Sequence, residues 1–229
     1  MDYIIEGFIE AVKLLLSIDR ELYSVILLSI IVSATATLLT LCSALPLGIA
    51  LGLKKFRGEG IFARIIFSLM GIPSVVIGLT VALLLSRRSL LGFLQLLYTP
   101  TAMIIAQVLL ITPLAMGLAY KLSKKQGRKI KNLGKTLGAD KFQIIALVFT
   151  ELKGEIFVIA LTCFSRAITE VGAVMIVGGN IKGRTRVMTT AISMLNSMGD
   201  YSMGIALGII LFLVTFILNC IVYSLHDDK

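Results

Sequence analysis

The chain has 229 residues and a formal net charge of +9; 57% of its residues are hydrophobic and 15% are charged. One soluble core of this size cannot enclose so much apolar surface, so the composition excludes an ordinary soluble protein and indicates a membrane protein. Loops beside a bilayer account for the positive charge, and we expect no nucleic-acid partner.

Residues 1–20 contain too short an apolar stretch to cross a bilayer, and the acidic side chains at positions 2, 6 and 10 do not fit a secretory signal. Apolar residues recur in this segment at helical spacing. The pattern predicts an interfacial helix that lies on the outer leaflet or packs across the membrane helices.

Five long apolar runs predict the membrane helices. Four contain no Asp, Glu, Lys or Arg (22–53, 65–86, 89–120 and 201–225), and a fifth, 156–181, is interrupted only by Arg166 and Glu170. Each exceeds the roughly 20 residues that cross the hydrocarbon as a helix, and none shows the alternation of a barrel strand. We therefore predict an all-α membrane protein with about five transmembrane helices in a single domain, residues 1–229.

Glycine and proline mark special positions within these runs. Gly71, Ile72 and Pro73 lie in the second run, where a weakened helix can be a simple kink or part of a gate. Two glycine pairs with a spacing of four residues permit close helix packing: Gly48 with Gly52, and Gly204 with Gly208.

The positions of the Lys and Arg residues predict the topology. The loop at 54–64 holds four of them and the loop at 121–153 holds nine, whereas seven fall on the opposite side. Because positive loops are retained in the cytosol, we expect the N-terminus outside and the C-terminus inside.

The cytosolic loop at 121–153 is predicted to fold as helix, sharp turn and helix. Ser123 with Gln126, and Asp140 with Gln143, have the spacing of capping boxes at helix starts, and Gly138 can adopt the left-handed conformation that ends a helix. We expect this loop to dock a cytosolic partner.

The chain shows no site for a nucleotide or a metal ion. Gly127 precedes Gly134-Lys135-Thr136 by six intervening residues instead of the four of a phosphate-binding loop. The three cysteines, at 42, 163 and 220, are far apart, and the one histidine is at 226. If transport needs ATP, a separate subunit must bind it.

Arg166 and Glu170 are charged residues in an apolar run. At the centre of a bilayer each costs roughly 2.5 to 3.5 kcal/mol on insertion scales, so both are expected to face protein or water. Their spacing of four residues allows an ion pair on one helix face. The pair can fix helix packing or a dimer contact, or it can line a transport path.

A cationic segment rich in hydroxyl groups follows that run. Gly178, Gly179 and Asn180 are predicted to end the helix. The segment after them can bind lipid headgroups, an acidic docking protein or an oxyanion. Its candidate residues are Lys182, Arg184, Thr185, Arg186, Thr189 and Thr190.

Residues 136–152, TLGADKFQIIALVFTEL, resemble the cytosolic coupling loop of permease subunits from ATP-binding-cassette importers. The match is partial, because Asn132-Leu133-Gly134 stands at the usual Glu-Ala-Ala positions and Glu151 at the usual proline. Together with SRAITEVGAV at 165–174 and GGNIKGRTRVMTTAI at 178–192, the chain is similar to tungstate-specific permeases, relatives of molybdate and sulfate permeases.

The resemblance implies a homodimer in a prokaryotic cell membrane, with two ATPase subunits and an extracytoplasmic oxyanion-binding protein. It implies that ATP and Mg bind the ATPase and that this chain carries no cofactor. Contact with the ATPase is implied for Leu133, Gly134, Leu137, Gly138, Ala139 and Phe142. A place on the transport path or its gate is implied for Arg166, Glu170, Gly178, Gly179 and Asn180.

Two other functions remain open. A molybdate or sulfate importer would present nearly the same permease surface, because all these ions are tetrahedral dianions. A channel or secondary carrier would need no ATPase, although the capped basic loop argues against it. A membrane enzyme fits less well, because Glu170 is the one carboxylate within the apolar runs.

Overall fold

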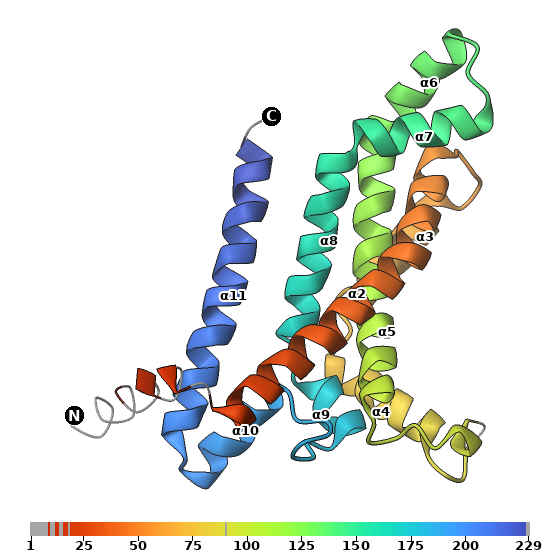
Figure 1. The fold of residues 1–229 in the computed structure, drawn as a ribbon. Helices are drawn as coiled ribbons and strands as arrows, with labels where there is room; N and C mark the ends of the chain where they lie inside the picture. The colour runs from red at the N-terminus through yellow and green to blue at the C-terminus, as the bar shows by residue number, and fades with distance from the viewer. Residues whose placement is uncertain (1–8, 10–11, 14–15, 18, 90, 228–229) are drawn as a thin grey trace.

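The computed structural model describes residues 9, 12, 13, 16, 17, 19–89 and 91–227. The interfacial helix predicted for residues 1–20 therefore falls largely outside the described residues. Within them every regular element is helical, which confirms the predicted all-α class (Figure 1).

Helices α2 (Arg20–Leu53) and α5 (Pro100–Leu122) form the central pair. Asp19 caps α2 by accepting a hydrogen bond from Leu22 N–H, and Thr99 caps α5, with Pro100 in the first turn where no N–H is required. Two glycines of α2 bring the helices close together. A Cβ on Gly48 would lie 2.7 Å from Met116 O, and one on Gly52 would lie 2.7 Å from Tyr120 O.

These contacts confirm that the first glycine pair is a packing site. The second pair makes no such close contact within the described chain: a Cβ on Gly204 would have only an ordinary 3.8 Å contact with Leu195, and one on Gly208 would meet no atom within 4 Å. Both lie in α11 (Tyr201–Asp227), a helix that is mostly uncovered by the rest of the described chain.

The second apolar run forms two helices, α3 (Glu59–Leu69) and α4 (Ser74–Leu85), with a bend of 90° between them. The break falls at Gly71, Ile72 and Pro73, where the sequence predicted a weak point. Pro73 adopts an extended ψ of 130° and lacks an N–H, so it ends the first helix and precedes the second.

The third run is shorter as a helix than predicted. Residues 91–99 form a connection with a short 3₁₀ turn, η1 (Gly92–Leu94), and α5 begins only at Pro100. Hydrophobicity alone could not reveal this start, because the loop residues are as apolar as the helix. The Thr99-Pro100 capping signal determines it.

The membrane segment predicted at 156–181 is also broken. Helix α8 (Lys153–Ile168) is followed by the short α9 (Gly172–Gly178) at an angle of 57°. The two breaks lie against each other: a Cβ on Gly78 of α4 would lie 2.6 Å from Ala173 Cα, and one on Gly172 would lie 3.0 Å from Ser74 Oγ. Helix α10 (Met188–Met198) then leads to α11.

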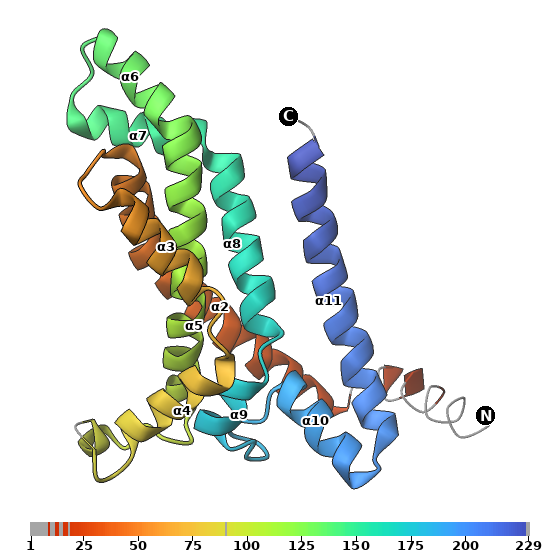
Figure 2. The same ribbon diagram turned by 180° about the vertical axis from the view of Figure 1, so that it is seen from behind.

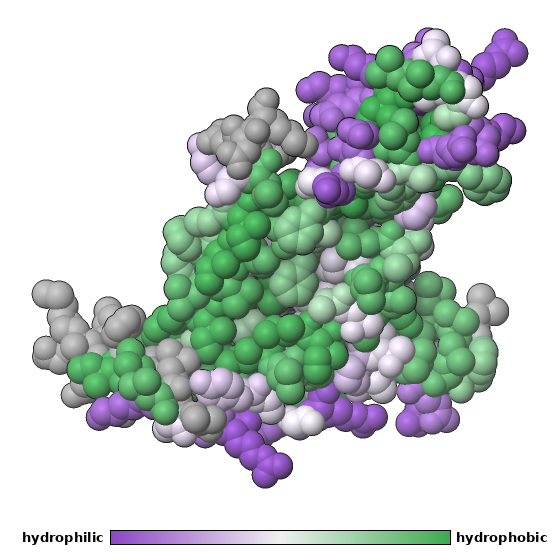
Figure 3. Space-filling model, turned by 45° about the horizontal axis from the view of Figure 1, so that its top comes forward, coloured by the Kyte–Doolittle hydropathy of each residue, from purple (hydrophilic) through white to green (hydrophobic). Residues whose placement is uncertain are grey.

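Among the residues that the structure describes, three helices are long and apolar enough to cross a membrane, and the count becomes five if each bent pair is one span. In Figures 1 and 2, α6 and α7 lie at one end of the molecule with the end of α11, whereas α10 and the connection from α9 lie at the other. Figure 3 shows an apolar band between two hydrophilic ends. This distribution is that of a protein embedded in a bilayer.

Candidate coupling surface and translocation path

The helical hairpin at one end of the molecule begins as an extension of α5. The chain passes without a break through a π-helical turn, η2 (Ser123–Gly127), into α6 (Arg128–Thr136). The predicted N-terminal cap at Ser123 is therefore wrong, because the helix of α5 continues through this residue and no new helix N-terminus forms there. The Ser123 side chain is buried against α2, and its hydroxyl donates a hydrogen bond to Ile49 O (2.9 Å).

The sharp turn and the second cap are as predicted. Gly138 has φ +79°, Ala139 N–H donates to Gly134 O (2.9 Å) and Gly138 N–H donates to Lys135 O (3.1 Å), which together form a Schellman motif. Asp140 and Gln143 then exchange two hydrogen bonds of 2.8 Å at the start of α7 (Lys141–Glu151).

This geometry leaves three large apolar side chains of the hairpin more than half exposed. Leu133 is 65% exposed, Leu137 85% and Phe142 84%. Gly134 instead lies inside the hairpin, where a Cβ would be 3.4 Å from Ile144. Apolar groups displayed among cations, beyond the apolar band, are typical of a protein-docking surface.

The cations at the base of the hairpin have structural partners that the sequence did not reveal. Arg128 Nε donates to Gly52 O and its Nη2 to Lys54 O, both at 2.8 Å, and Lys131 Nζ donates to Leu53 O at 2.8 Å. These side chains satisfy carbonyl groups at the C-terminus of α2, which have no partner within that helix.

Glu59, at the start of α3, completes this base. Its Oε1 accepts hydrogen bonds from Tyr120 (2.9 Å) and Arg128 (2.7 Å) and lies 2.9 Å from Lys124 Nζ. A sequence signal existed, because Glu59 is the one acidic residue of the basic 54–64 loop.

Arg166 and Glu170 pair within one chain, with 2.7 Å between Arg166 Nη1 and Glu170 Oε2. Their environments differ: the Arg166 side chain is 42% exposed, whereas that of Glu170 is 2% exposed. The other oxygen of Glu170 accepts from Ala173 N–H (3.1 Å), and its carbonyl accepts from the Thr189 hydroxyl (2.7 Å). Glu170 therefore connects α8, α9 and α10 at the break.

The predicted end of the helix after that break is confirmed. Gly179 and Asn180 have φ of +70° and +50°, which end α9. Gly178 is buried, and a Cβ there would lie 3.0 Å from Met103 Sδ.

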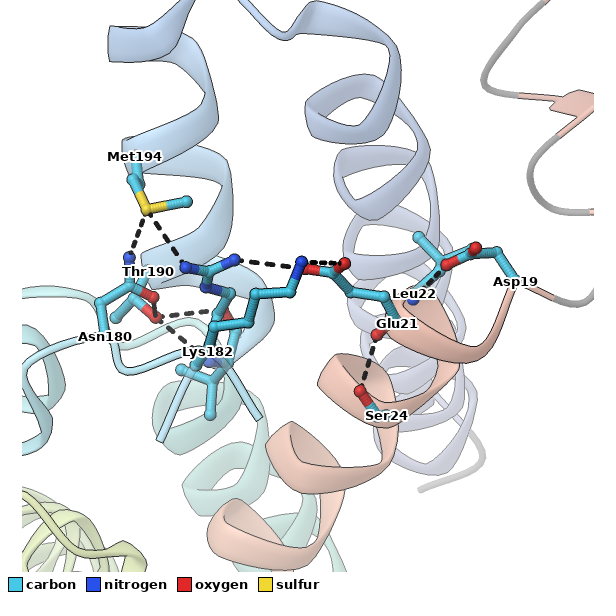
Figure 4. A network of polar contacts seen from close by, with 10 residues as sticks. Asp19, Glu21, Leu22, Ser24, Asn180, Lys182, Thr190 and Met194 are labelled. Carbon is cyan, nitrogen blue, oxygen red and sulfur yellow. Dashed lines mark hydrogen bonds and ion pairs between the residues drawn. The ribbon is translucent and has the colours of Figure 1, made fainter. Parts of the chain in front are cut away.

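The three threonines that follow are buried and hydrogen-bonded. Thr185 donates to Gly178 O (2.7 Å), Thr189 bonds to Glu170 as above, and Thr190 lies 3.0 Å from Asn180 Oδ1 (Figure 4). Their hydroxyl groups are used inside the fold, so the expected hydroxyl-rich surface is not present in this conformation.

The cations of this segment reach the start of α2. Glu21 forms ion pairs with Lys182 and with Arg186, and the Arg186 pair has a distance of 3.3 Å between Nη1 and Oε1. Figure 4 shows Lys182 extended toward Glu21. The Arg186 side chain is only 14% exposed. Of the six candidate residues predicted in this cationic segment, Lys182 and Arg184 are exposed on the surface.

Residues 44–228 match the family of binding-protein-dependent transport system inner membrane components. The chain belongs to this family. The permease is 57% identical to the tungstate uptake system permease protein TupB of Peptoclostridium acidaminophilum over 228 residues, covering 100% of each chain. The predicted resemblance to importer permeases is thus confirmed.

Two further relatives extend this similarity. The permease is 36% identical to a probable anion ABC transporter permease protein of Haloferax volcanii, covering 90% of this chain and 91% of the relative. It is 34% identical to the TupB permease protein of Campylobacter jejuni, covering 98% and 94%.

Proposed function

We propose that this permease imports tungstate as the membrane subunit of an ATP-driven transporter. The observation that carries the proposal is the 57% identity, over the whole length of both chains, to a permease named for tungstate uptake. The ion would arrive from an extracytoplasmic binding protein. Molybdate or sulfate is the second candidate, because a tetrahedral dianion offers the permease nearly the same surface.

The proposed assembly contains two copies of the permease and two ATPase subunits, which hold ATP and Mg. The hairpin end, with its exposed Leu133, Leu137 and Phe142, would face the cytosol and contact the ATPase. The positive loops at 54–64 and 121–153 support this orientation. The opposite end, with Lys182 and Arg184, would meet the binding protein, whose approach those charges would steer.

The proposed path passes the break between α8 and α9. Arg166 lies about 20 Å along α8 from Lys153, at 1.5 Å per residue, so it reaches well into the apolar band. Its half-exposed guanidinium is too costly to leave in lipid, so this face must meet water or a second copy. An arginine there offers hydrogen bonds that suit an oxyanion.

The test is uptake into vesicles that contain the permease, its ATPase and its binding protein. We expect ATP-dependent uptake of tungstate, with molybdate and sulfate as weaker competitors. Affinities of the isolated binding protein for the three ions, measured in parallel, would show whether selectivity resides there. Preferred uptake of sulfate would contradict the tungstate assignment, and uptake that persists without ATP would favour a carrier.

A further inference from the structure

A polar cluster outside the proposed path lies at the base of the hairpin, where Glu59 of α3 meets side chains from three other elements. One oxygen of Glu59 receives Tyr120 from α5, Lys124 from η2 and Arg128 from α6. The Glu59 and Arg128 side chains are 19% and 20% exposed, so solvent screens their pair only partly.

Arg128 extends this cluster to a fifth element, α2. The same guanidinium that meets Glu59 also donates to Gly52 O and Lys54 O at the end of α2. A charged, planar group with several directed hydrogen bonds holds its partners in a fixed orientation. The start of α3 is thereby attached to the base of the hairpin by charge-assisted bonds as well as by the chain itself.

Helix α3 leads directly to the region of the proposed path. It ends at the 90° bend before α4, and α4 packs on α9 through Gly78 and Ala173. A displacement of α3 at Glu59 therefore reaches the two packed breaks through one rigid helix. The other contacts of α3 are apolar ones with α5, such as Phe62 on Tyr120, and none of the residues of α3 is buried, so the Glu59 cluster supplies its directed polar attachment.

We propose that Glu59 is a positioning residue for energy coupling: it makes α3 move with the hairpin, so that movement of the hairpin by the ATPase displaces the α4 and α9 breaks. The inference rests on the proposed ATP-driven function. It assigns a role to an ion-pair cluster at the base of the hairpin, separate from Leu137 and Phe142, the exposed side chains of the hairpin that are proposed to contact the ATPase.

The first test compares uptake with ATP hydrolysis in the complete transporter. Glu59→Gln keeps the size of the side chain and removes its charge. Coupling between sites commonly changes an equilibrium by about 5- to 150-fold, so we expect uptake per ATP hydrolysed to fall at least about fivefold while ATPase co-purification is unchanged. Lys55→Gln, which removes an exposed cation from the same loop, is the matched control and should retain normal coupling.

Tyr120→Phe provides a milder variant, should Glu59→Gln fail to assemble. It removes one donor to Glu59 and keeps the ring that packs on Phe62 (5.4 Å between centroids). We expect a smaller decrease in uptake per ATP. A normal ratio in both Tyr120→Phe and an assembled Glu59→Gln transporter would overturn the proposal.

A distance measurement tests the same inference without any transported ion. Spin labels are placed at Ile61 of α3 and Lys129 of α6, both exposed, after the three native cysteines are replaced by alanine. With the ATPase bound, we expect the distance between the labels to be the same with and without trapped nucleotide, and to change with nucleotide in Glu59→Gln. A nucleotide-dependent distance with Glu59 present would overturn the proposal. This outcome does not depend on which ion the permease transports.

Discussion

At the scale of single residues, backbone conformation and burial explain which positions are sensitive to substitution. Gly138 is exposed and has no neighbouring atom that a Cβ would touch, so its requirement for glycine comes only from φ +79°. Glu170 has the opposite constraint: its backbone is ordinary, but its carboxylate is almost completely buried. Each case gives a specific prediction.

Gly138→Val should distort the hairpin turn and reduce ATP-dependent uptake. A side chain in the left-handed region costs roughly 1 to 2 kcal/mol, and a β-branched one is among the least tolerated. Uptake and ATPase co-purification are the measurements. Gly60→Ala, at an exposed helical glycine with open space around it, is the control and should behave like the unmodified permease. Normal uptake and assembly in Gly138→Val would refute the role of this turn in coupling.

Arg166→Met should destabilise the permease, because it leaves the buried Glu170 carboxylate with Ala173 N–H as its remaining partner among the contacts described. An unsatisfied buried group costs about 1 to 3 kcal/mol, and more when it is charged. The double variant Arg166→Met with Glu170→Gln removes both charges and should recover most of the lost thermal stability. We expect its uptake to stay low if Arg166 lies on the path; normal uptake would mean that the pair is only structural.

At the scale of helices, the ends and the breaks determine how the elements are placed. The Asp140 capping box fixes where α7 begins, and the glycines at the two breaks allow α4 and α9 to touch. The first feature depends on hydrogen bonds and the second on the absence of side chains, so different substitutions test them.

Asp140→Ala should fray the first turn of α7. Loss of an N-cap side chain costs about 1 kcal/mol, and Asp140→Ser should preserve most of it because serine caps equally well. The measurement is amide hydrogen exchange at residues 141–143, which we expect to accelerate in the alanine variant alone. Equal exchange in both variants would show that the cap does not stabilise this helix.

Gly78→Ala should destabilise the contact between the two broken segments. The added methyl group would lie 2.6 Å from Ala173 Cα, a backbone atom that cannot rotate away, and overpacking of this kind costs about 1 to 3 kcal/mol. The thermal unfolding temperature and uptake should both fall. Gly208→Ala, in a helix with open space at that position, should leave both unchanged; a stable and active Gly78→Ala protein would contradict the close packing of α4 on α9.

At the scale of the whole molecule, the hydrophilic end that displays Leu137 and Phe142 is separated from the other hydrophilic end by the apolar band. In the proposed assembly the two ends meet different partners. Their separation also means that any signal between a docked ATPase and the path must travel through the helices themselves.

Leu137→Asp and Phe142→Asp should each weaken binding of the ATPase. Burial of a Leu or Phe side chain contributes about 1.5 to 3 kcal/mol, so the affinity should fall about tenfold or more. Co-purification of the ATPase is the measurement. Phe93→Asp, at a 77% exposed phenylalanine in the connection between α4 and α5, controls for the loss of an exposed aromatic ring. Full retention of the ATPase by both hairpin variants would refute the assigned docking surface.

The sequence by itself determined the class of the fold, the five apolar segments and the hairpin turn, because these depend on local properties: run length, Gly138 and the spacing of Asp140 and Gln143. It misassigned Ser123, whose hydroxyl bonds to a residue 74 positions away, and it did not find the cluster around Glu59, whose partner Arg128 is 69 positions away. The burial of Thr185, Thr189 and Thr190 and the meeting of the two breaks were likewise decided only by the tertiary structure. Local hydrogen bonds and hydrophobicity are written into neighbouring residues, whereas the partner of a polar side chain depends on which helices pack together.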